Sequence, residues 1–320
     1  NWRRNMIRYC YRRILLAIPV MVGISLLAFI LGLLSPGDPA EFALNQDGLD
    51  APTDAQIAAM REELGLNRPI YVQYFSWFVQ VLHGNFGSSY ISGKDILHEL
   101  LLRLPVTVEL ALLALAIAAV VGIALGTLCA VYKNSWLDDA VQFLTNILLA
   151  VPGFWLALLM ILLFSETLRL LPTSGSESLR YFIMPALAVS FSTSATVCRY
   201  MRSSLLTEFA SQYFLVARVR GISKMKLLFC YAFPNAMLPV IALLGNYLAG
   251  ILGGSVIAES IFALPGISSM ALEAIRFRDY PVLQAYVLFT GWLLVLITLA
   301  VDLLMFYLNP KLRGGAEVHD

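Results

Sequence analysis

Six uncharged, largely apolar runs dominate this sequence and determine the solvent in which it can fold. They contain no Asp, Glu, Lys or Arg and cover residues 14–34, 110–132, 140–165, 181–198, 227–258 and 280–301. A helix rises about 1.5 Å per residue, so the first run alone can cross a hydrocarbon layer of about 30 Å. The strands of a membrane β-barrel would instead alternate apolar and polar residues over about ten positions. The sequence therefore predicts an all-α polytopic membrane protein with six transmembrane helices.

The composition agrees with this interpretation and excludes several other classes of protein. Hydrophobic residues make up 59% of the 320 residues, charged residues make up only 13%, and the net charge is +1. Soluble domains are about 25% charged. This balance excludes a disordered chain, a nucleic-acid-binding domain and most soluble enzymes.

The distribution of Lys and Arg predicts the orientation, because cytoplasmic segments of membrane proteins are enriched in these residues. With the N-terminus and C-terminus in the cytoplasm, the cytoplasmic segments hold 14 basic and 5 acidic residues, and the outer segments hold 8 and 14. A cleaved signal peptide is the alternative for the first run, but 21 apolar residues exceed the usual signal core of about 7–15. The predicted organisation is a cytoplasmic segment (1–13), a first span (14–34), an outer segment (35–104), a transmembrane core (105–310) and a tail (311–320).

The outer segment is expected to contain short helices that lie at the membrane surface. Thr53 and Gln56 have the spacing of a capping box, and Gly65 can end the helix that they begin. The following stretch, 69–82, is dense in aromatic residues, which favours an interfacial helix. Packing against the outer ends of the spans is the alternative, and a ligand site is a third.

The cytoplasmic loop 199–235 is strongly basic and is predicted to fold as helix, break and helix. Its first helix should end at Arg220, Gly221 should supply a left-handed residue, and Ser223 should cap the second helix. Such a protrusion suits docking of a cytoplasmic partner. A basic loop held at anionic lipid headgroups explains the same charges, and the residues alone leave both interpretations open.

Further sequence features describe how the spans pack. Gly122 and Gly126, and the group Gly250, Gly253 and Gly254, would permit close approach of helices. Pro19, Pro152, Pro185 and Pro239 can kink their helices. The four cysteines fall near the cytoplasmic side and are expected to stay reduced.

Motifs for catalysis, cofactor binding and metal binding are absent from the sequence. It has three dispersed histidines and neither GxSxG nor GxGxxG, so the chain is not expected to be an enzyme. Glu109 and Asp302 are the ionisable residues expected near the bilayer, and both lie at span ends. A self-contained secondary carrier or a polytopic membrane enzyme remains the rival class, although neither fits this lack of ions in the spans.

Several motifs follow one another along the second half of the chain. They are Ala217-Arg-Val-Arg-Gly221, Phe233-Pro-Asn-Ala-Met-Leu-Pro239, Glu259-Ser-Ile-Phe262, Pro265-Gly266 and Arg278-Asp-Tyr-Pro-Val282. In this order they resemble the peptide/nickel branch of bacterial ABC importer permeases. The first two are similar to the loop that docks on the ATPase subunit, and the last three are the most specific matches. Leu215 and Val216 replace the usual Glu and Ala of the docking loop, a departure common in this branch.

The resemblance implies the type I importer permease fold in a bacterial inner membrane, and it implies a set of partners. These are a second homologous permease, two cytoplasmic ATPase subunits that bind ATP and Mg²⁺, an extracytoplasmic solute-binding protein, and membrane lipid. The short outer loop 166–180 favours nickel or a metal chelate as the cargo, with dipeptides or oligopeptides as the alternative.

The resemblance also selects two sets of candidate site residues. The ATPase-coupling loop would use Ala217, Arg218, Arg220, Gly221, Ser223, Asn235 and Pro239. A gate or a contact with the binding protein would use Glu259, Phe262, Pro265, Gly266, Arg278, Asp279, Tyr280 and Pro281.

Overall fold

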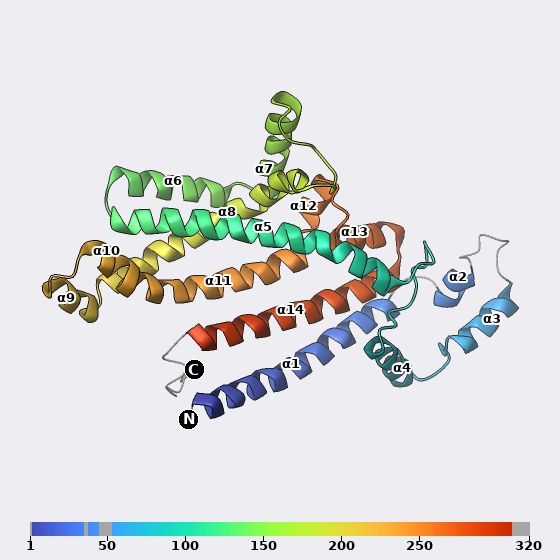
Figure 1. The fold of residues 1–320 in the computed structure, drawn as a ribbon. Helices are drawn as coiled ribbons and strands as arrows, with labels where there is room; N and C mark the ends of the chain where they lie inside the picture. The colour runs from blue at the N-terminus through green and yellow to red at the C-terminus, as the bar shows by residue number, and fades with distance from the viewer. Residues whose placement is uncertain (1, 35–37, 45–52, 309–320) are drawn as a thin grey trace. The chain divides into compact units, whose positions relative to one another are not determined.

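The computed structural model describes residues 2–34, 38–44 and 53–308, and nearly all of the regular structure in these residues is helical (Figure 1). The chain divides into two compact units. Unit 1 consists of Asn1–Ile14, Val106–Leu264 and Leu296–Asp320, and unit 2 consists of Leu15–Pro105 and Pro265–Val295. The long helices α1 (Trp2–Leu33), α5 (Ile96–Val131) and α14 (Tyr280–Leu308) each contribute residues to both units.

Unit 1 is built around one central helix, α8 (Leu179–Phe209), which packs against α6, α7 and α11. The most apolar window of α8 is 61% buried inside the protein, whereas the other long membrane helices are 11–28% buried. The remaining helices of this unit are α6 (Trp136–Ala150), α7 (Gly153–Met160), α9 (Gln212–Val219), α10 (Lys224–Lys226), α11 (Phe233–Gly254) and α12 (Val256–Ile261). Two π-helical segments, η2 (Ile161–Thr167) and η3 (Leu227–Ala232), extend α7 and precede α11.

The predicted close approach of helices is confirmed at Gly122 and Gly126. A Cβ added to Gly122 would lie 2.6 Å from the Cβ of Val197, and one added to Gly126 would lie 2.5 Å from the carbonyl oxygen of Cys198. Glycine is therefore required where α5 meets α8. The second predicted group behaves differently, because a Cβ at Gly250 or Gly254 would meet no atom of the described residues within 4 Å. The expected close approach at these two glycines is therefore not made among the residues that the structure describes.

The third predicted span, over residues 140–165, is broken at Pro152, one of the prolines that were predicted to kink their helices. Helices α6 and α7–η2 meet at a bend of 99°. Val151 is extended, with φ −82° and ψ 127°, as expected for a residue that precedes a proline. Pro152 then begins the next helix, where its missing N–H is not needed. Five helices of the described chain are long and apolar enough to cross a membrane, and this bent pair makes up to six.

Unit 2 contains the short helices that were predicted for the outer segment. They are α2 (Pro39–Leu44), α3 (Asp54–Glu63) and α4 (Ile70–Leu82), and the unit also includes α13 (Ile267–Phe277). The side chain of Gln56 accepts a hydrogen bond from the Thr53 N–H at 2.9 Å, and Gly65 has φ +69° after the end of α3. The start and the stop of this helix are therefore confirmed.

Helix α4 packs on α1 through part of its aromatic stretch. The ring of Tyr74 lies 5.4 Å from that of Phe29 in an edge-to-face contact, and the hydroxyl groups of Tyr74 and Ser25 are 2.7 Å apart. Tyr71 and Phe75 remain 67% and 61% exposed. One side of α4 thus follows the packing interpretation, while the other leaves aromatic rings available for the membrane surface.

Candidate functional site

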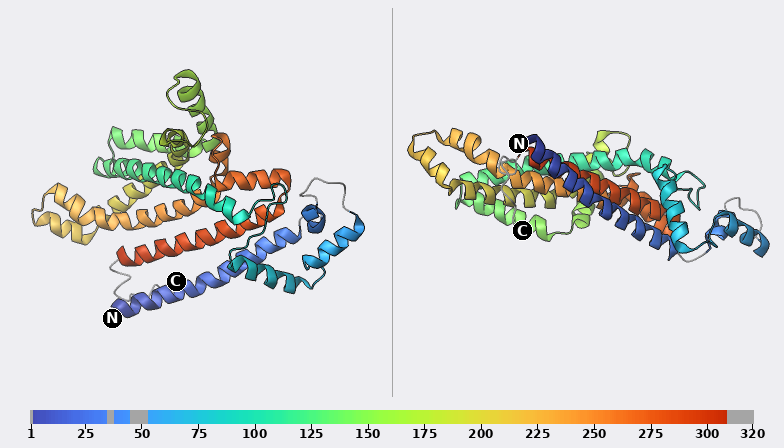
Figure 2. Two further views of the ribbon diagram at one scale, coloured as in Figure 1. Left: turned by 45° about the vertical axis from the view of Figure 1, so that its right-hand side comes forward. Right: turned by 90° about the horizontal axis from the view of Figure 1, so that it is seen from below.

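The predicted docking loop forms a helical hairpin at one end of unit 1, beyond the ends of α8 and α11 (Figure 2). Helix α9 ends at Val219, and Gly221 follows with φ +77°, the left-handed conformation that glycine adopts without strain. The predicted break is therefore confirmed. Ser223 precedes α10 as expected, but its hydroxyl group makes no capping hydrogen bond, so this part of the prediction is wrong.

A polar cluster fixes the hairpin to the helices on either side of it. The Tyr213 hydroxyl donates to the Glu208 carboxylate at the end of α8, and the Asn235 side chain donates to the Tyr213 hydroxyl at 3.2 Å. Asn235 also donates to the Tyr231 carbonyl at 3.0 Å. Burial, and then the nearby Glu208, raise the pKa of Tyr213, so the phenol stays protonated and keeps donating. Asn235 is thus brought next to α9 and positions it.

Val219 and Met225 are the most exposed of the apolar side chains on this hairpin. Val219 is 88% exposed and Met225 is 66% exposed, although both residue types are usually buried. Arg218, Arg220 and Gly221 are exposed beside them, whereas Ala217 is 6% exposed and packs inward. Sequence reasoning selected the basic residues and missed Val219 and Met225, since an apolar residue in a short helix gives no sign of its exposure.

The first part of the predicted gate segment belongs to the core of unit 1. Glu259 on α12 is completely buried, and one oxygen of its carboxyl group accepts hydrogen bonds from Thr107 at 2.8 Å and from Ser255 at 2.7 Å. Phe262 is 1% exposed and lies in the main hydrophobic cluster. The Glu259 carboxyl group thus ties α12 to α5, and neither side chain is on the surface in this structure. The contact with a binding protein stays a prediction.

The second part of the gate segment lies in unit 2. Arg278 ends α13 with φ +58° and is exposed, while Asp279 is 5% exposed and accepts hydrogen bonds from the Ser89 hydroxyl and the Tyr90 N–H. Burial raises the pKa of Tyr90 to about 12, with smaller contributions from Asp279 and Asp38. Asp279 therefore fixes the 88–92 loop to the start of α14.

The other gate residues of unit 2 differ in exposure. Pro265 is exposed, Gly266 is buried immediately before α13, and Tyr280 and Pro281 are half-buried at the start of α14. Pro265 and Arg278 are thus the members of the predicted set whose side chains are exposed.

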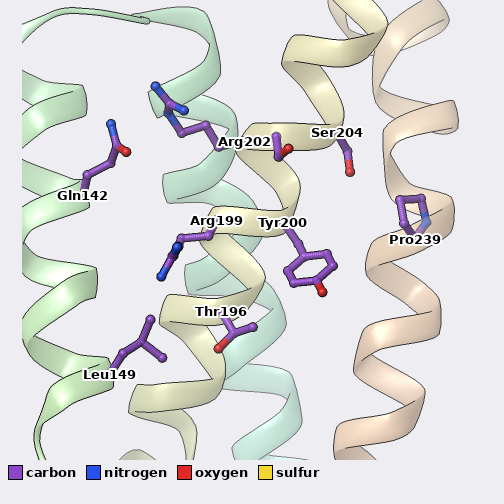
Figure 3. Close-up of a pocket in the computed structure, with 9 residues that line it drawn as sticks. Gln142, Leu149, Thr196, Arg199, Tyr200, Arg202, Ser204 and Pro239 are labelled. Carbon is purple, nitrogen blue, oxygen red and sulfur yellow. The ribbon is translucent and has the colours of Figure 1, made fainter.

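A polar groove of about 720 Å³ in unit 1 was not predicted (Figure 3). Helix α8 forms its floor, with α6 on one side and α11 on the other. Its lining residues are Gln142, Leu149, Thr196, Arg199, Tyr200, Arg202, Ser203, Ser204 and Pro239. Pro239 was assigned to the coupling loop by resemblance, and the structure places it on the wall of this groove.

A buried ion pair borders the groove and joins two residues that lie just outside the predicted spans. The Arg202 guanidinium donates two hydrogen bonds to Asp138, at 2.8 and 2.7 Å, and the Asp138 side chain is 1% exposed. The Gln142 amide donates to the same carboxylate at 3.1 Å. A paired Asp and Arg can be accommodated in an apolar bundle because each compensates the charge of the other. This pair ties α6 to α8.

The described residues contain no group of three or more His, Cys, Asp or Glu side chains that could hold a metal ion. Cys129, Cys198 and Cys230 are all free thiols. The polar side chains described above are thus hydrogen-bond donors, arginines, and carboxylates that already have an arginine or hydrogen-bond donor as partner. Such side chains can bind and position polar groups.

Comparison with known families gives two matches that together cover most of the chain. Residues 122–314 match the family described as binding-protein-dependent transport system inner membrane component. Residues 6–111 match the N-terminal family of the same membrane components.

Curated relatives match over nearly the whole length of both chains. The probable D,D-dipeptide transport system permease protein DdpB of Escherichia coli is 34% identical over 93% of this chain and 95% of its own. A putative peptide transport system permease protein of Brucella abortus is 37% identical, over 94% and 98%. The glutathione transport system permease protein GsiC of Salmonella typhimurium is 33% identical, over 96% and 99%.

Solved structures support the fold of the core. The methionine ABC transporter MetNI in an inward-facing conformation aligns with a TM-score of 0.57 and 17% identity, over 66% of this chain and 96% of that one. An amino acid ABC transporter aligns with a TM-score of 0.53 and 15% identity, over 65% and 94%.

Proposed function

Because the chain belongs to the binding-protein-dependent inner membrane components, the permeases of bacterial ABC importers, we propose that it forms half of the pathway of a peptide importer. Within that family it is a member of the peptide/nickel branch, and its helices lie in the bacterial inner membrane. The cargo and the partners are the parts that we propose.

The relatives are named for transport of similar cargo, and this agreement supports our choice of cargo. Proteins named for transport of a D,D-dipeptide, of peptides and of glutathione are 33–37% identical to this chain over at least 93% of its length. The short 166–180 loop favoured nickel or a metal chelate, but none of these three names mentions a metal. Dipeptides or oligopeptides, the alternative in the sequence analysis, are therefore the cargo that we propose.

The chemistry of the groove in unit 1 also supports a peptide over a bare metal ion. The groove is lined by two arginines, four hydroxyl groups and an amide, and none of its lining residues is acidic. Such a surface repels a free divalent cation and offers hydrogen-bond donors to carboxylate and carbonyl oxygens.

The remaining components of the importer follow from the family. We propose that a second homologous permease completes the pathway, that two ATPase subunits dock on the α9–α10 hairpin, and that a solute-binding protein delivers the cargo. ATP and Mg²⁺ would bind to the ATPase subunits, so this chain would be non-catalytic. The exposure of Val219 and Met225 supports docking at the hairpin, because exposed apolar side chains mark sites of association.

The test is transport by the assembled complex. The chain is purified with the proteins that associate with it, reconstituted in liposomes that contain ATP, and supplied with binding protein loaded either with a labelled dipeptide or with nickel. We expect an ATPase to co-purify and ATP-dependent uptake of the dipeptide at least tenfold faster than that of nickel. Nickel uptake without dipeptide uptake would overturn the choice of cargo, and purification without any ATPase would overturn the choice of partners.

A further inference from the structure

One face of α8 carries a continuous polar stripe. It consists of Thr196, the pair Arg199 and Tyr200, and the pair Ser203 and Ser204. Each pair follows three and four residues after a preceding member, so that all five share one side of the helix. All five line the groove between α6 and α11 (Figure 3). A membrane helix normally presents apolar side chains to lipid and polar side chains to protein or water. This polar face is therefore expected to contact water, protein or a polar ligand.

The two arginines of the groove differ in whether a neighbouring carboxylate compensates their charge. Arg202 forms its two hydrogen bonds with the buried Asp138 carboxylate, so its charge is compensated. The Arg199 side chain makes no ion pair or hydrogen bond with any residue that the structure describes. Arg199 therefore supplies the uncompensated positive charge of the groove.

Neighbouring hydroxyl groups are also available for a ligand. Within the described chain, the side-chain hydroxyls of Tyr200, Ser203 and Ser204 have no hydrogen-bond partner. Figure 3 shows Arg199 directed towards α6, and Tyr200 and Ser204 directed towards α11. The groove thus presents one planar cation and several hydroxyl donors, a combination that binds carboxylate or phosphate oxygens.

We propose that Arg199 binds the C-terminal carboxylate of the peptide cargo inside the permease. This inference rests on the proposed function. A free C-terminal carboxylate is a feature that ordinary linear peptides share, whereas their side chains vary. A guanidinium can hold both oxygens of a carboxylate at once, and the hydroxyl groups can contact the adjacent backbone. The contact would thus accept peptides of different sequence.

A phospholipid is the other source of a similar anionic group. Arg199 directly follows the uncharged run 181–198, at the position where an arginine can extend to lipid phosphates. A contact with lipid would depend on the anionic lipid content of the membrane and would not depend on the end group of the peptide. The experiment therefore varies both.

The experiment compares uptake by the unaltered importer, Arg199→Gln and Arg199→Lys, each reconstituted in liposomes. Binding protein is supplied at saturation and is preloaded with one peptide, whose C-terminus is either a free carboxylate or an amide. Saturating, preloaded binding protein removes its own preference from the measured rate. Arg180→Gln is the matched control, since it removes an exposed cation from the outer end of the same helix, outside the groove. Each variant is measured in liposomes with and without phosphatidylglycerol.

We expect Arg199→Gln to lower uptake of the free-carboxylate peptide about tenfold, the scale for loss of a charge-assisted hydrogen bond. Uptake of the amide and ATP hydrolysis stimulated by the binding protein should stay unchanged. Arg199→Lys should retain part of the uptake, because it keeps the charge and loses the planar fork, and Arg180→Gln should match the unaltered importer.

Two results would overturn the inference. One is an equal loss of uptake for both peptides, and the other is a loss that appears only with phosphatidylglycerol, which assigns Arg199 to lipid. Failure of the proposed function is distinguishable from both, because the unaltered importer would then take up neither peptide.

Discussion

The α9–α10 hairpin and helix α12 carry two of the strongest stretches of family resemblance, yet the structure gives them opposite environments. On the hairpin, Val219 is 88% exposed, and no described residue has an atom within 4 Å of a Cβ added to the left-handed Gly221. On α12, Glu259 is fully buried and its carboxyl group accepts two hydroxyl hydrogen bonds. A motif shared within a family can therefore lie on an exposed surface or in a buried core that stabilises the fold.

This difference predicts which measurement each segment should affect. Substitutions in a buried, hydrogen-bonded core change the free energy of unfolding, whereas substitutions on an exposed surface leave it nearly unchanged. Loss of function at α12 should thus accompany loss of stability, whereas loss of function through an exposed hairpin side chain should not. Gly221 lies between these cases, because its left-handed backbone strains other residues. Three substitutions test this contrast, in order of decreasing effect on stability.

Glu259→Ala should have the largest effect. It removes an acceptor from the buried hydroxyls of Thr107 and Ser255 and leaves a cavity, so we expect the free energy of unfolding to fall by about 3 kcal/mol. Denaturant unfolding of the purified chain in detergent measures this change. Glu259→Gln is the matched control, because it keeps the shape and one acceptor oxygen, and it should lose about 1 kcal/mol.

The opposite result for Glu259 would break the comparison. If Glu259→Ala unfolds like the unaltered chain but no longer responds to loaded binding protein in the ATPase assay, Glu259 acts as a contact residue. The gate assignment made from resemblance would then hold for this side chain.

Gly221→Val should have an intermediate effect on stability and a large one on transport. An added Cβ would meet no atom within 4 Å in the part of the chain that the structure describes, but a β-branched residue is strained at φ +77° by about 1–2 kcal/mol. The strain would change the angle between α9 and α10. We expect the ATPase to co-purify normally while peptide uptake falls at least tenfold.

Gly221→Asn is the control for this substitution, because asparagine tolerates the left-handed conformation. It should keep most of the uptake. Normal uptake by Gly221→Val would show that the hairpin does not transmit the ATPase motion through this residue.

The sequence predicted the elements of the fold better than their environments. Uncharged runs are sufficient to locate membrane helices, and Gly122 and Gly126 correctly indicated a close approach to α8. The bend at Pro152 was only partly predicted, because a proline signals a kink but not its angle of 99°. The angle depends on where the two halves pack.

The candidate site shows the same limit at the level of single residues. Asp138 and Arg202 are 64 positions apart, and only the packing of α6 on α8 brings them to 2.7 Å. The polar stripe on α8 has the 3–4 spacing in the sequence itself, and this pattern could have indicated the groove. Arg199 directly follows an apolar run, so the sequence indicates the end of a span at this residue and does not indicate a binding role.

Val219→Ser should have the smallest effect on stability and is the sharpest test of the surface half of the contrast. The side chain is 88% exposed and the two residues have similar helix propensity, so the free energy of unfolding should change by less than about 0.5 kcal/mol. If the hairpin docks on the ATPase, loss of an exposed apolar anchor should weaken that association about tenfold, measured by titrating ATPase onto the reconstituted permease. Leu170→Ser is the matched control, since Leu170 is 66% exposed in the outer loop and its replacement should change neither quantity. Unchanged ATPase affinity in Val219→Ser would mean that exposure at the hairpin marks something other than docking, and would leave the charged residues Arg218 and Arg220 to carry the contact.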